Sequence, residues 1–347
     1  MHKIIYCLWA LSMLSACVGR HADKSPFRMA ISVDKVVSDS LFLSFPGELR
    51  VTSEHILLQT PFDRDGFLKV YDRQSGEELA WKGSIGQGPA EWTTPSFGNS
   101  TDSGLVIYDP NMKKYVFAKE KNMYEDVSEF ESMKKIDVRP LAFVSLNDNL
   151  SIAAEYGDTP FKMLSDGKVS SCGKYPFDKA VSNTFDCFQG LLAIHPEKKL
   201  MIYGMSFNPY IALYRINSDG IEPVWEKQFK EADYSVSDEQ WHWGRNQPTG
   251  MSEMTLTKDY IVCLRADENN TGKTFSIYMR GREMNIPLLS IYLFDYDGNL
   301  KYILDPSVHI IRLASDIHSN TLYAVNIEKD YSIVRFDIDG AISGCEQ

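Results

Sequence analysis

Apolar and polar residues alternate in short runs along most of the chain, and turn residues with glycine commonly end each run. Alternation with a period of two turns one face of a β-strand toward the protein interior. Asp-Gly pairs supply residues that tolerate the positive φ of tight hairpin turns. The pattern therefore predicts a series of hairpins. Their first strands cover residues 67–72, 105–109, 161–164, 211–216, 290–295 and 332–337.

The spacing of these hairpins indicates one repeated unit of about 50 residues, which is the length of a propeller blade. A single sheet of this kind would expose an apolar face and two edges. Radial stacking of several sheets covers the faces and leaves only short edges. We therefore predict an all-β fold, a six-bladed β-propeller, with insertions between Trp225 and Ile291. A β-sandwich or two small β-domains is the alternative architecture.

An early strand at residues 27–33 precedes the first complete unit. We expect this N-terminal strand to complete the last blade, where it would lie beside residues 332–336. A sheet shared by both ends of the chain would keep the ring closed at its weakest seam. Residues 27–347 would then form a single β-propeller domain. The best helix candidate, at residues 121–135, has only weak periodicity.

The N-terminus has the pattern of an export signal. Residues 1–3 are positively charged and residues 4–13 are apolar, a stretch too short to span a membrane. Leu14-Ser15-Ala16-Cys17 follows and resembles a bacterial lipobox. We predict that residues 1–16 are a lipoprotein signal peptide, that Cys17 is lipidated, and that residues 17–26 are a tether.

The lipid on Cys17 would be the protein's contact with the membrane, and each buried CH₂ group of its acyl chains would contribute ~0.8 kcal/mol to anchoring. The expected location is the cell envelope, with the lipid in the outer membrane on its periplasmic or surface face. The alternative is an ordinary signal peptide that happens to contain a cysteine.

Four cysteines remain after Cys7 leaves with the signal and Cys17 takes the lipid. An exported chain meets an oxidising environment, in which disulfides form. Cys172 and Cys187 are the best candidates for a bond, because they would close a short loop that stabilises by ~3 kcal/mol. Four unpaired, mostly buried thiols are an equally acceptable outcome.

Composition and motifs exclude several function classes. The net charge of −11 disfavours binding to nucleic acid, since an acidic surface repels phosphates. The sequence contains no G-x-S-x-G, H-E-x-x-H or C-x-x-C motif. We expect no metal and no cofactor, and the sequence identifies no catalytic residues.

One segment is a candidate ligand site. Trp241, His242, Trp243 and Arg245 lie close together within the longest irregular region of the chain. Aromatic surfaces beside polar donors are a common way to hold sugars and peptides. In a strand, Trp241 and Trp243 would share one face and His242 would point the other way. The alternative is that both tryptophans pack between blades.

Three stretches carry a resemblance to a known family. They are residues 85–91 (IGQGPAE), residues 256–264 (LTKDYIVCL) and the whole of residues 291–339, including residues 322–325 (LYAV). In these the chain resembles the Bacteroidales lipoproteins described as six-bladed, TolB-like β-propellers. The resemblance implies a propeller and anchoring at the cell surface or in the periplasm, and it implies no catalytic residues. The Ser-Pro-Asp-Gly turn favoured by true TolB repeats is absent, with residues 164–167 (LSDG) the nearest match.

The sequence therefore favours a non-catalytic binding or scaffold lipoprotein. Its ligand would be a glycan, a peptide or an envelope protein. The alternative is a glycan hydrolase or lyase with its site at the central channel. A channel lined by carboxylates, arginine, histidine and tyrosine would favour the enzyme, whereas aromatic side chains and backbone would favour binding.

Overall fold

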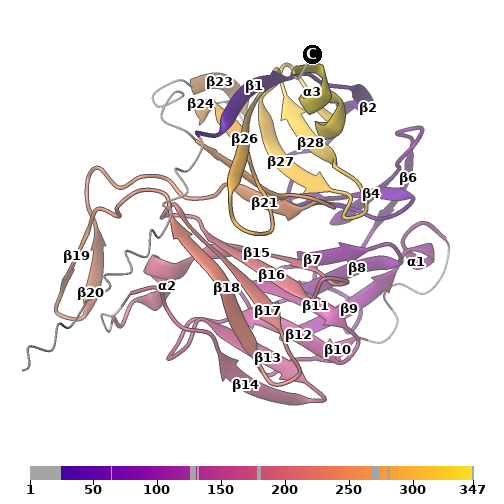
Figure 1. Cartoon of the computed structure of the whole chain (residues 1–347). Helices are drawn as coiled ribbons and strands as arrows, with labels where there is room; N and C mark the ends of the chain where they lie inside the picture. Colours follow the sequence, from indigo (N-terminus) through magenta and orange to yellow (C-terminus); the bar gives the residue numbers. More distant parts are fainter. Residues whose placement is uncertain are drawn as a thin grey trace, which may run out of the picture.

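The computed structural model of the protein describes residues 25–63, 65–125, 130, 133–177, 181–266, 274–279 and 282–345. These residues form a six-bladed β-propeller, which confirms the predicted fold class (Figure 1). The predicted signal peptide and Cys17, the predicted lipidation site, lie outside the described residues. No helix within the described ranges has both the length and the apolar composition that a membrane crossing requires.

The first three blades are four-stranded antiparallel sheets that follow the chain from inside to outside. Blade 1 contains β3 (Leu49–Val51), β4 (His55–Gln59), β5 (Leu68–Asp72) and β6 (Glu78–Lys82). Blade 2 contains β7 (Ser96–Thr101), β8 (Gly104–Asp109), β9 (Lys114–Lys119) and β10 (Lys134–Lys135). Blade 3 contains β11 (Ala142–Asn147), β12 (Leu150–Ala154), β13 (Phe161–Ser165) and β14 (Lys168–Cys172).

The remaining blades combine later strands with the N-terminal segment. Blade 4 contains β15 (Gly190–His195), β16 (Leu200–Met205), β17 (Tyr210–Ile216) and β18 (Ile221–Gln228). Blade 5 contains β21 (Glu253–Leu256), β22 (Ile261–Ala266), β25 (Leu289–Phe294), β26 (Leu300–Pro306) and β1 (Phe27–Ile31). Blade 6 contains β27 (Ile310–Ser315), β28 (Thr321–Ile327), β29 (Tyr331–Asp337) and β2 (Lys35–Leu41). The first strand of each blade contacts the first strands of its neighbours around the central channel.

Two hairpins and three helices are added to the blades. The hairpins are β19 (Tyr234–Ser237) with β20 (Gln240–Trp243), and β23 (Thr274–Met279) with β24 (Arg282–Pro287). Both fall between Trp225 and Ile291, where the sequence predicts insertions. The helices are α1 (Lys121–Tyr124), α2 (Thr184–Phe188) and α3 (Ile338–Cys345). The predicted helix at residues 121–135 is therefore only one turn long in the described part, and β10 takes up its end.

The hydrophobic core is divided among the interfaces between adjacent blades. One buried cluster joins blades 1 and 2 through side chains such as Phe67 and Trp92. Similar clusters join each following pair of blades, including the last and the first. Each buried aliphatic or aromatic side chain contributes roughly 1.5–3 kcal/mol relative to exposure. This packing explains why sheets that would be unstable alone are stable as a ring.

The way the ring closes differs in detail from the prediction. An N-terminal strand does complete the last blade, but that strand is β2, which pairs antiparallel with β29. The segment expected there, residues 27–33, instead supplies β1, which pairs parallel with β26 as a fifth strand of blade 5. Arg28 fixes this pairing through two contacts with Asp305, of 2.7 and 2.5 Å. Both strands bury alternate apolar residues, so alternation alone does not distinguish their partners.

The C-terminus shows a consequence of this closure. The sixth predicted hairpin continued from residues 332–337 through Asp339-Gly340 into another strand, whereas the structure has helix α3 there. Because β2 already occupies the outer position of blade 6, the chain after β29 has no sheet edge to join. The other Asp-Gly turns differ among themselves. Asp166 and Gly167, between β13 and β14, both have positive φ angles, of 49° and 75°, and Gly298 has a φ of 84°, whereas Asp219 and Gly220 do not adopt a positive φ.

Candidate functional site

A cavity of about 340 Å³ opens at the end of the central channel where the innermost strands begin. It is lined by Phe45, Gly47, Glu48, Arg50, Gln59, Pro61, Phe62, Leu191, Leu192, Glu253, Met254 and Arg312. We call this cavity the channel mouth. Deeper in the channel lies a second cavity of only about 50 Å³. The side chains that line it include Val51, Ile194 and Leu256. The size of the channel mouth is at the lower end of the range for small-molecule sites.

The opposite end of the channel is crossed by polar side chains. His318, in the loop after β27, places Nε2 2.9 Å from Oδ2 of Asp102, in the loop after β7. Its Nδ1 lies 4.0 Å from Oε1 of Glu197, in the loop after β15. These contacts join blades 6, 2 and 4 across the axis. A ligand that enters the channel mouth would therefore meet a constriction and not an open passage.

Arg50 lies at the channel mouth and is held by backbone groups of two blades. It donates hydrogen bonds through Nε to the Gly98 carbonyl (2.5 Å), through Nη1 to the Leu49 carbonyl (2.8 Å) and through Nη2 to the Phe97 carbonyl (3.2 Å). Glu48 accepts a hydrogen bond from the Phe97 backbone N–H (2.5 Å). These contacts connect the innermost strands of blades 1 and 2.

Arg312 performs a related role at the seam between the last blade and the first. Its Nε donates to the Gly47 carbonyl (2.7 Å), and its Nη1 donates to the Ile311 carbonyl (2.8 Å) and to Oε1 of Glu253 (3.2 Å). The guanidinium also lies over the ring of Phe45, 5.4 Å from its centroid. Arg312 therefore bridges blades 5, 6 and 1 around the cavity.

The electrostatics of the channel mouth are nearly balanced. Burial raises the pKa of Glu253 to about 7, although Arg312 and Arg50 act to lower it. Burial also raises the pKa of Glu48. A carboxyl group with a raised pKa is protonated more readily, and in the protonated form it both donates and accepts hydrogen bonds. The cavity thus offers guanidinium groups that donate hydrogen bonds and carboxyl groups that accept them or, when protonated, also donate them. Its other walls are apolar.

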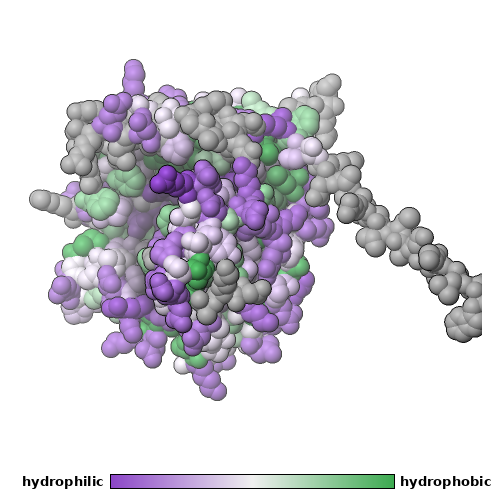
Figure 2. Space-filling model, turned by 90° about the vertical axis from the view of Figure 1, so that its left-hand side faces the viewer, coloured by the Kyte–Doolittle hydropathy of each residue, from purple (hydrophilic) through white to green (hydrophobic). Residues whose placement is uncertain are grey.

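The face around the channel mouth also carries exposed aromatic side chains. Phe42 (88% exposed) and Phe185 lie in connections that lead to innermost strands, while Phe62 and Phe207 lie in loops between the second and third strands of their blades. All of these connections meet at the same end of the antiparallel sheets. Figure 2 views the molecule from the side on which α2 and the β19–β20 hairpin lie, and shows a hollow with hydrophobic patches along its rim. Such patches are typical of interaction surfaces.

The structure separates the predicted ligand residues by exposure. Trp241 is only 4% exposed, stacks on Tyr234 with ring centroids 3.8 Å apart, and contacts Phe177 at 4.6 Å. Trp243 lies on the same face of the hairpin, 5.0 Å from Trp241. Trp241 therefore anchors the hairpin to the core between blades 3 and 4.

The polar members of the predicted site lie at the surface. His242 and Arg245 are exposed, and His242 points away from the tryptophans, as the strand pattern indicates. These two side chains are accessible to a partner, whereas the face of Trp241 is covered. A ligand at this hairpin stays a prediction.

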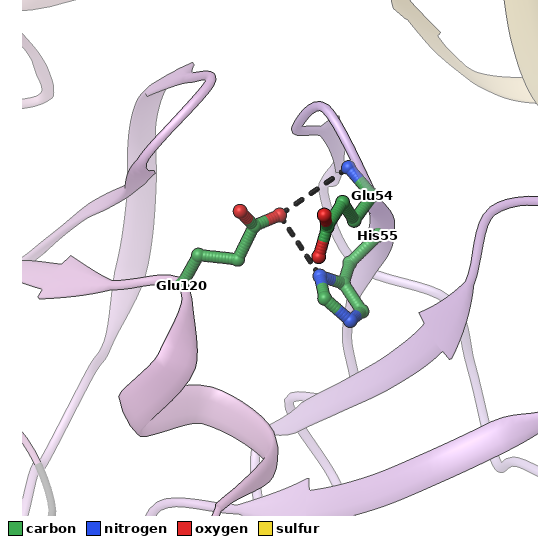
Figure 3. Close-up of side chains that lie close together, drawn as sticks. All are labelled: Glu54, His55 and Glu120. Atoms are coloured by element: carbon green, nitrogen blue, oxygen red, sulfur yellow. Dashed lines mark hydrogen bonds and ion pairs between the residues drawn. The ribbon is translucent and has the colours of Figure 1, made fainter.

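One group in the described residues has the composition of a metal site (Figure 3). Candidate ligand atoms of Glu54, His55 and Glu120 lie within 4.8 Å of one another. Glu120 Oε1 already accepts hydrogen bonds from His55 Nδ1 (2.8 Å), from the Glu54 backbone N–H (3.4 Å) and from the Thr52 hydroxyl. A metal ion would have to replace the hydrogen bond from His55. We therefore interpret the group as a contact between blades 1 and 2.

The candidate disulfide is not formed. Cys172 lies on the outer strand β14, whereas Cys187 lies in α2, and no bond joins their sulfur atoms. The thiol of Cys187 instead donates a hydrogen bond to the carbonyl of Asn183 (3.3 Å). Burial raises the pKa of Cys172 to about 11, so this thiol is protonated at neutral pH. In the structure, none of Cys172, Cys187 and Cys263 forms a disulfide bond.

Sequence reasoning missed the charged residues of the channel mouth. The sequence feature that could have identified them is an arginine between two apolar residues of a short strand. Leu49-Arg50-Val51 and Ile311-Arg312-Leu313 both have this pattern. Arg50 and Arg312 lie on innermost strands and border the channel mouth. Sequence alone did not show which strands are innermost, so these residues could not be grouped.

Comparisons with known proteins identify the fold. Neither a protein-family model nor a curated protein matches the chain. Among solved structures, a candidate exported protein of Bacteroides fragilis NCTC 9343 is similar, with 12% identity, a TM-score of 0.53, and coverage of 90% of this chain and 98% of that one. A member of the DUF4221 family from Bacteroides vulgatus ATCC 8482 has 9% identity, a TM-score of 0.57, and coverage of 88% and 97%. At these identities the similarity shows the propeller fold alone.

Proposed function

We propose that this protein is a lipid-anchored β-propeller of the bacterial cell envelope that binds a ligand at the channel mouth without chemical conversion. The observation that carries the proposal is the cavity itself. It is concave, it combines Arg312 and Glu253 with the apolar rings of Phe45 and Phe62, and it is continuous with a face rich in exposed aromatic residues. A few polar groups converging in a largely apolar concavity are the usual composition of ligand sites.

The cellular part of the proposal rests on the N-terminal pattern and on the neighbouring folds. The lipobox at residues 14–17 supports export and anchoring through Cys17, and we place the anchor in the outer membrane. A candidate exported protein of Bacteroides fragilis has a similar fold, which supports the same compartment for this chain. The resemblance of residues 85–91, 256–264 and 291–339 to TolB-like lipoproteins of Bacteroidales supports membership of that group.

A binding screen with matched variants tests the channel mouth. Purified full-length protein would be applied to arrays of oligosaccharides and of peptides. We expect at least one class to bind the wild type and to be lost in Phe62→Ala, which removes a ring at the cavity. Phe207→Ala removes an exposed ring on the same face outside the cavity, and should retain binding. Binding that survives Phe62→Ala, or its absence for every class, would refute the proposed site.

A second candidate function is hydrolysis of a glycan at the same place. The specific observation in its favour is that Glu48 and Glu253 line one cavity and that the pKa of Glu253 is about 7, suitable for a general acid. Incubation with the oligosaccharides that bind, followed by chromatography of the products, distinguishes the two functions. Product release by the wild type that is abolished in Glu253→Gln would establish the enzyme; unchanged oligosaccharides support binding alone.

A further inference from the structure

The hydrogen-bonding groups at the channel mouth are only partly used within the protein. Nη1 and Nε of Arg312 are engaged, whereas no described residue hydrogen-bonds to its Nη2. Glu253 accepts a hydrogen bond at Oε1, and no described residue donates to its Oε2. An adjacent pair consisting of one planar donor and one carboxyl oxygen suits neighbouring hydroxyl groups, each of which both donates and accepts.

The formal charges at the channel mouth cancel while both of its carboxyl groups are ionised. Two carboxyl groups, Glu48 and Glu253, face two guanidinium groups, Arg50 and Arg312. Arg50 is committed to three backbone carbonyls, and Arg312 is paired with Glu253. A strongly anionic or cationic ligand would therefore meet no net attraction of opposite charge. The balance favours an uncharged polar ligand.

The same arginines disfavour an extended peptide. A peptide that added a strand at the channel mouth would need carbonyl groups on the inner edges of the innermost strands. Arg50 and Arg312 already donate to the carbonyls of Leu49, Phe97, Gly98, Gly47 and Ile311. These inner-edge acceptors of blades 1, 2 and 6 are thus capped by side chains. A ligand must be recognised through side chains and ring faces.

Two phenylalanine rings provide an apolar wall beside the free polar atoms. Phe45 and Phe62 have ring centroids 6.4 Å apart and planes inclined by 58°. Phe62 is 61% exposed, and Phe45 lies against the Arg312 guanidinium. A ligand with an apolar face and polar edges would fit between this wall and the Glu253–Arg312 pair, in a volume of about 340 Å³.

Resting on the proposed function, we infer that the ligand of the channel mouth is a neutral oligosaccharide, with one terminal sugar ring seated against Phe45 and Phe62 and its hydroxyl groups on Arg312 and Glu253. A pyranose ring has the required shape, since its C–H face is apolar and its hydroxyl groups project from the edge. The remaining sugars of the oligosaccharide would extend over the exposed aromatic residues around the channel mouth.

Calorimetric titration of the full-length protein tests this assignment. The probes are a panel of neutral oligosaccharides built from glucose, mannose, galactose, xylose and N-acetylglucosamine, a matched panel containing uronic acids, and an uncharged peptide mixture. A neutral oligosaccharide should bind the wild type best. Phe62→Ala should weaken it roughly tenfold, a loss of about 1.4 kcal/mol, because the substitution removes a ring against which the sugar packs. Arg312→Lys should weaken it as well, since lysine lacks the planar fork.

Two controls keep the outcome interpretable. Phe207→Ala, outside the cavity, should bind like the wild type. Because Arg312 also joins blades, the stability of Arg312→Lys is compared with that of the wild type by urea unfolding. Phe62 is exposed, so a loss of binding in Phe62→Ala does not reflect a loss of folding. Preferred binding of a uronic-acid oligosaccharide or of the peptides, with loss in Phe62→Ala, would overturn the sugar assignment and leave the binding site standing. Binding of no probe would overturn both.

Discussion

The seam between the last blade and the first is held by a side-chain network that can be disrupted selectively. Arg73, after β5 in blade 1, donates through Nη2 to Oδ2 of Asp316 in blade 6 (2.6 Å) and through Nε to the hydroxyl of Tyr323 (2.8 Å). Its Nη1 donates to the carbonyl of Thr52 (3.0 Å). The side chains of Arg73 and Asp316 are 18% and 16% exposed. We predict that Arg73→Met destabilises the propeller.

The expected loss of unfolding free energy lies between the losses that follow disruption of an exposed ion pair and of a buried one. Exposed pairs contribute about 0–1 kcal/mol, whereas removing one partner of a buried pair costs about 3–5 kcal/mol. Because both side chains retain some contact with solvent, we expect Arg73→Met to cost about 2–3 kcal/mol. Asp316→Asn should cost less, about 1–2 kcal/mol, because the amide oxygen still accepts a hydrogen bond.

The same pair predicts a dependence on pH. Burial acts to raise the pKa of Asp316, but hydrogen bonds from Arg73, from the His318 backbone N–H and from Ser319 outweigh it and hold the pKa below its usual value. An acid with a lowered pKa in the folded state stabilises that state above its unfolded pKa of about 3.9 and loses this contribution as the pH falls through the folded value. The gap in stability between the wild type and Arg73→Met should therefore narrow as the pH falls below about 4.

Urea unfolding followed by tryptophan fluorescence measures these effects at pH 7 and pH 3. The control is Arg335→Met, which removes a comparable pair with Asp34 at a more exposed place, 38% and 39% exposed, and should cost less than about 1 kcal/mol. A double-mutant cycle between Arg73→Met and Asp316→Asn should show strong coupling. Additive effects of the two substitutions, or a gap that is the same at both pH values, would refute the reasoning.

Further predictions concern closure, anchoring and the inserted hairpin. Leu41→Ala on β2 should cost about 2–3 kcal/mol in urea unfolding because Leu41 is buried between blades 6 and 1, whereas Val36→Ala, on the exposed side of the same strand, should cost less than about 0.5 kcal/mol. Cys17→Ala should prevent labelling by a fatty-acid analogue and release the protein from membrane fractions; continued labelling would contradict lipidation at this residue. Trp241→Ala should accelerate proteolysis within the β19–β20 hairpin, since it removes the ring that contacts Tyr234 and Phe177, and His242→Ala, an exposed neighbour, should not.

The fold class and the repeat follow from local features of the amino-acid sequence. Period-two alternation marks strands because the pleat turns successive side chains to opposite faces, and Asp166-Gly167 marks a turn because both residues adopt positive φ. These are local properties, and each is set by a few neighbouring residues. The number of such hairpins was enough to predict six blades, and the excess length between Trp225 and Ile291 was enough to predict the insertions.

Tertiary structure alone decided which elements become neighbours. β1 and β2 have similar alternation, and only the packed ring assigns one to blade 5 and the other to blade 6. Glu48, Glu253 and Arg312 are far apart in the sequence and meet only because their strands are innermost. Conversely, Trp241 was predicted to bind a ligand because it is an aromatic residue near polar side chains. In the folded protein, Tyr234 and Phe177 cover its ring. A local pattern records whether a side chain prefers the interior, whereas the identity of its neighbours depends on how separate segments of the chain pack together.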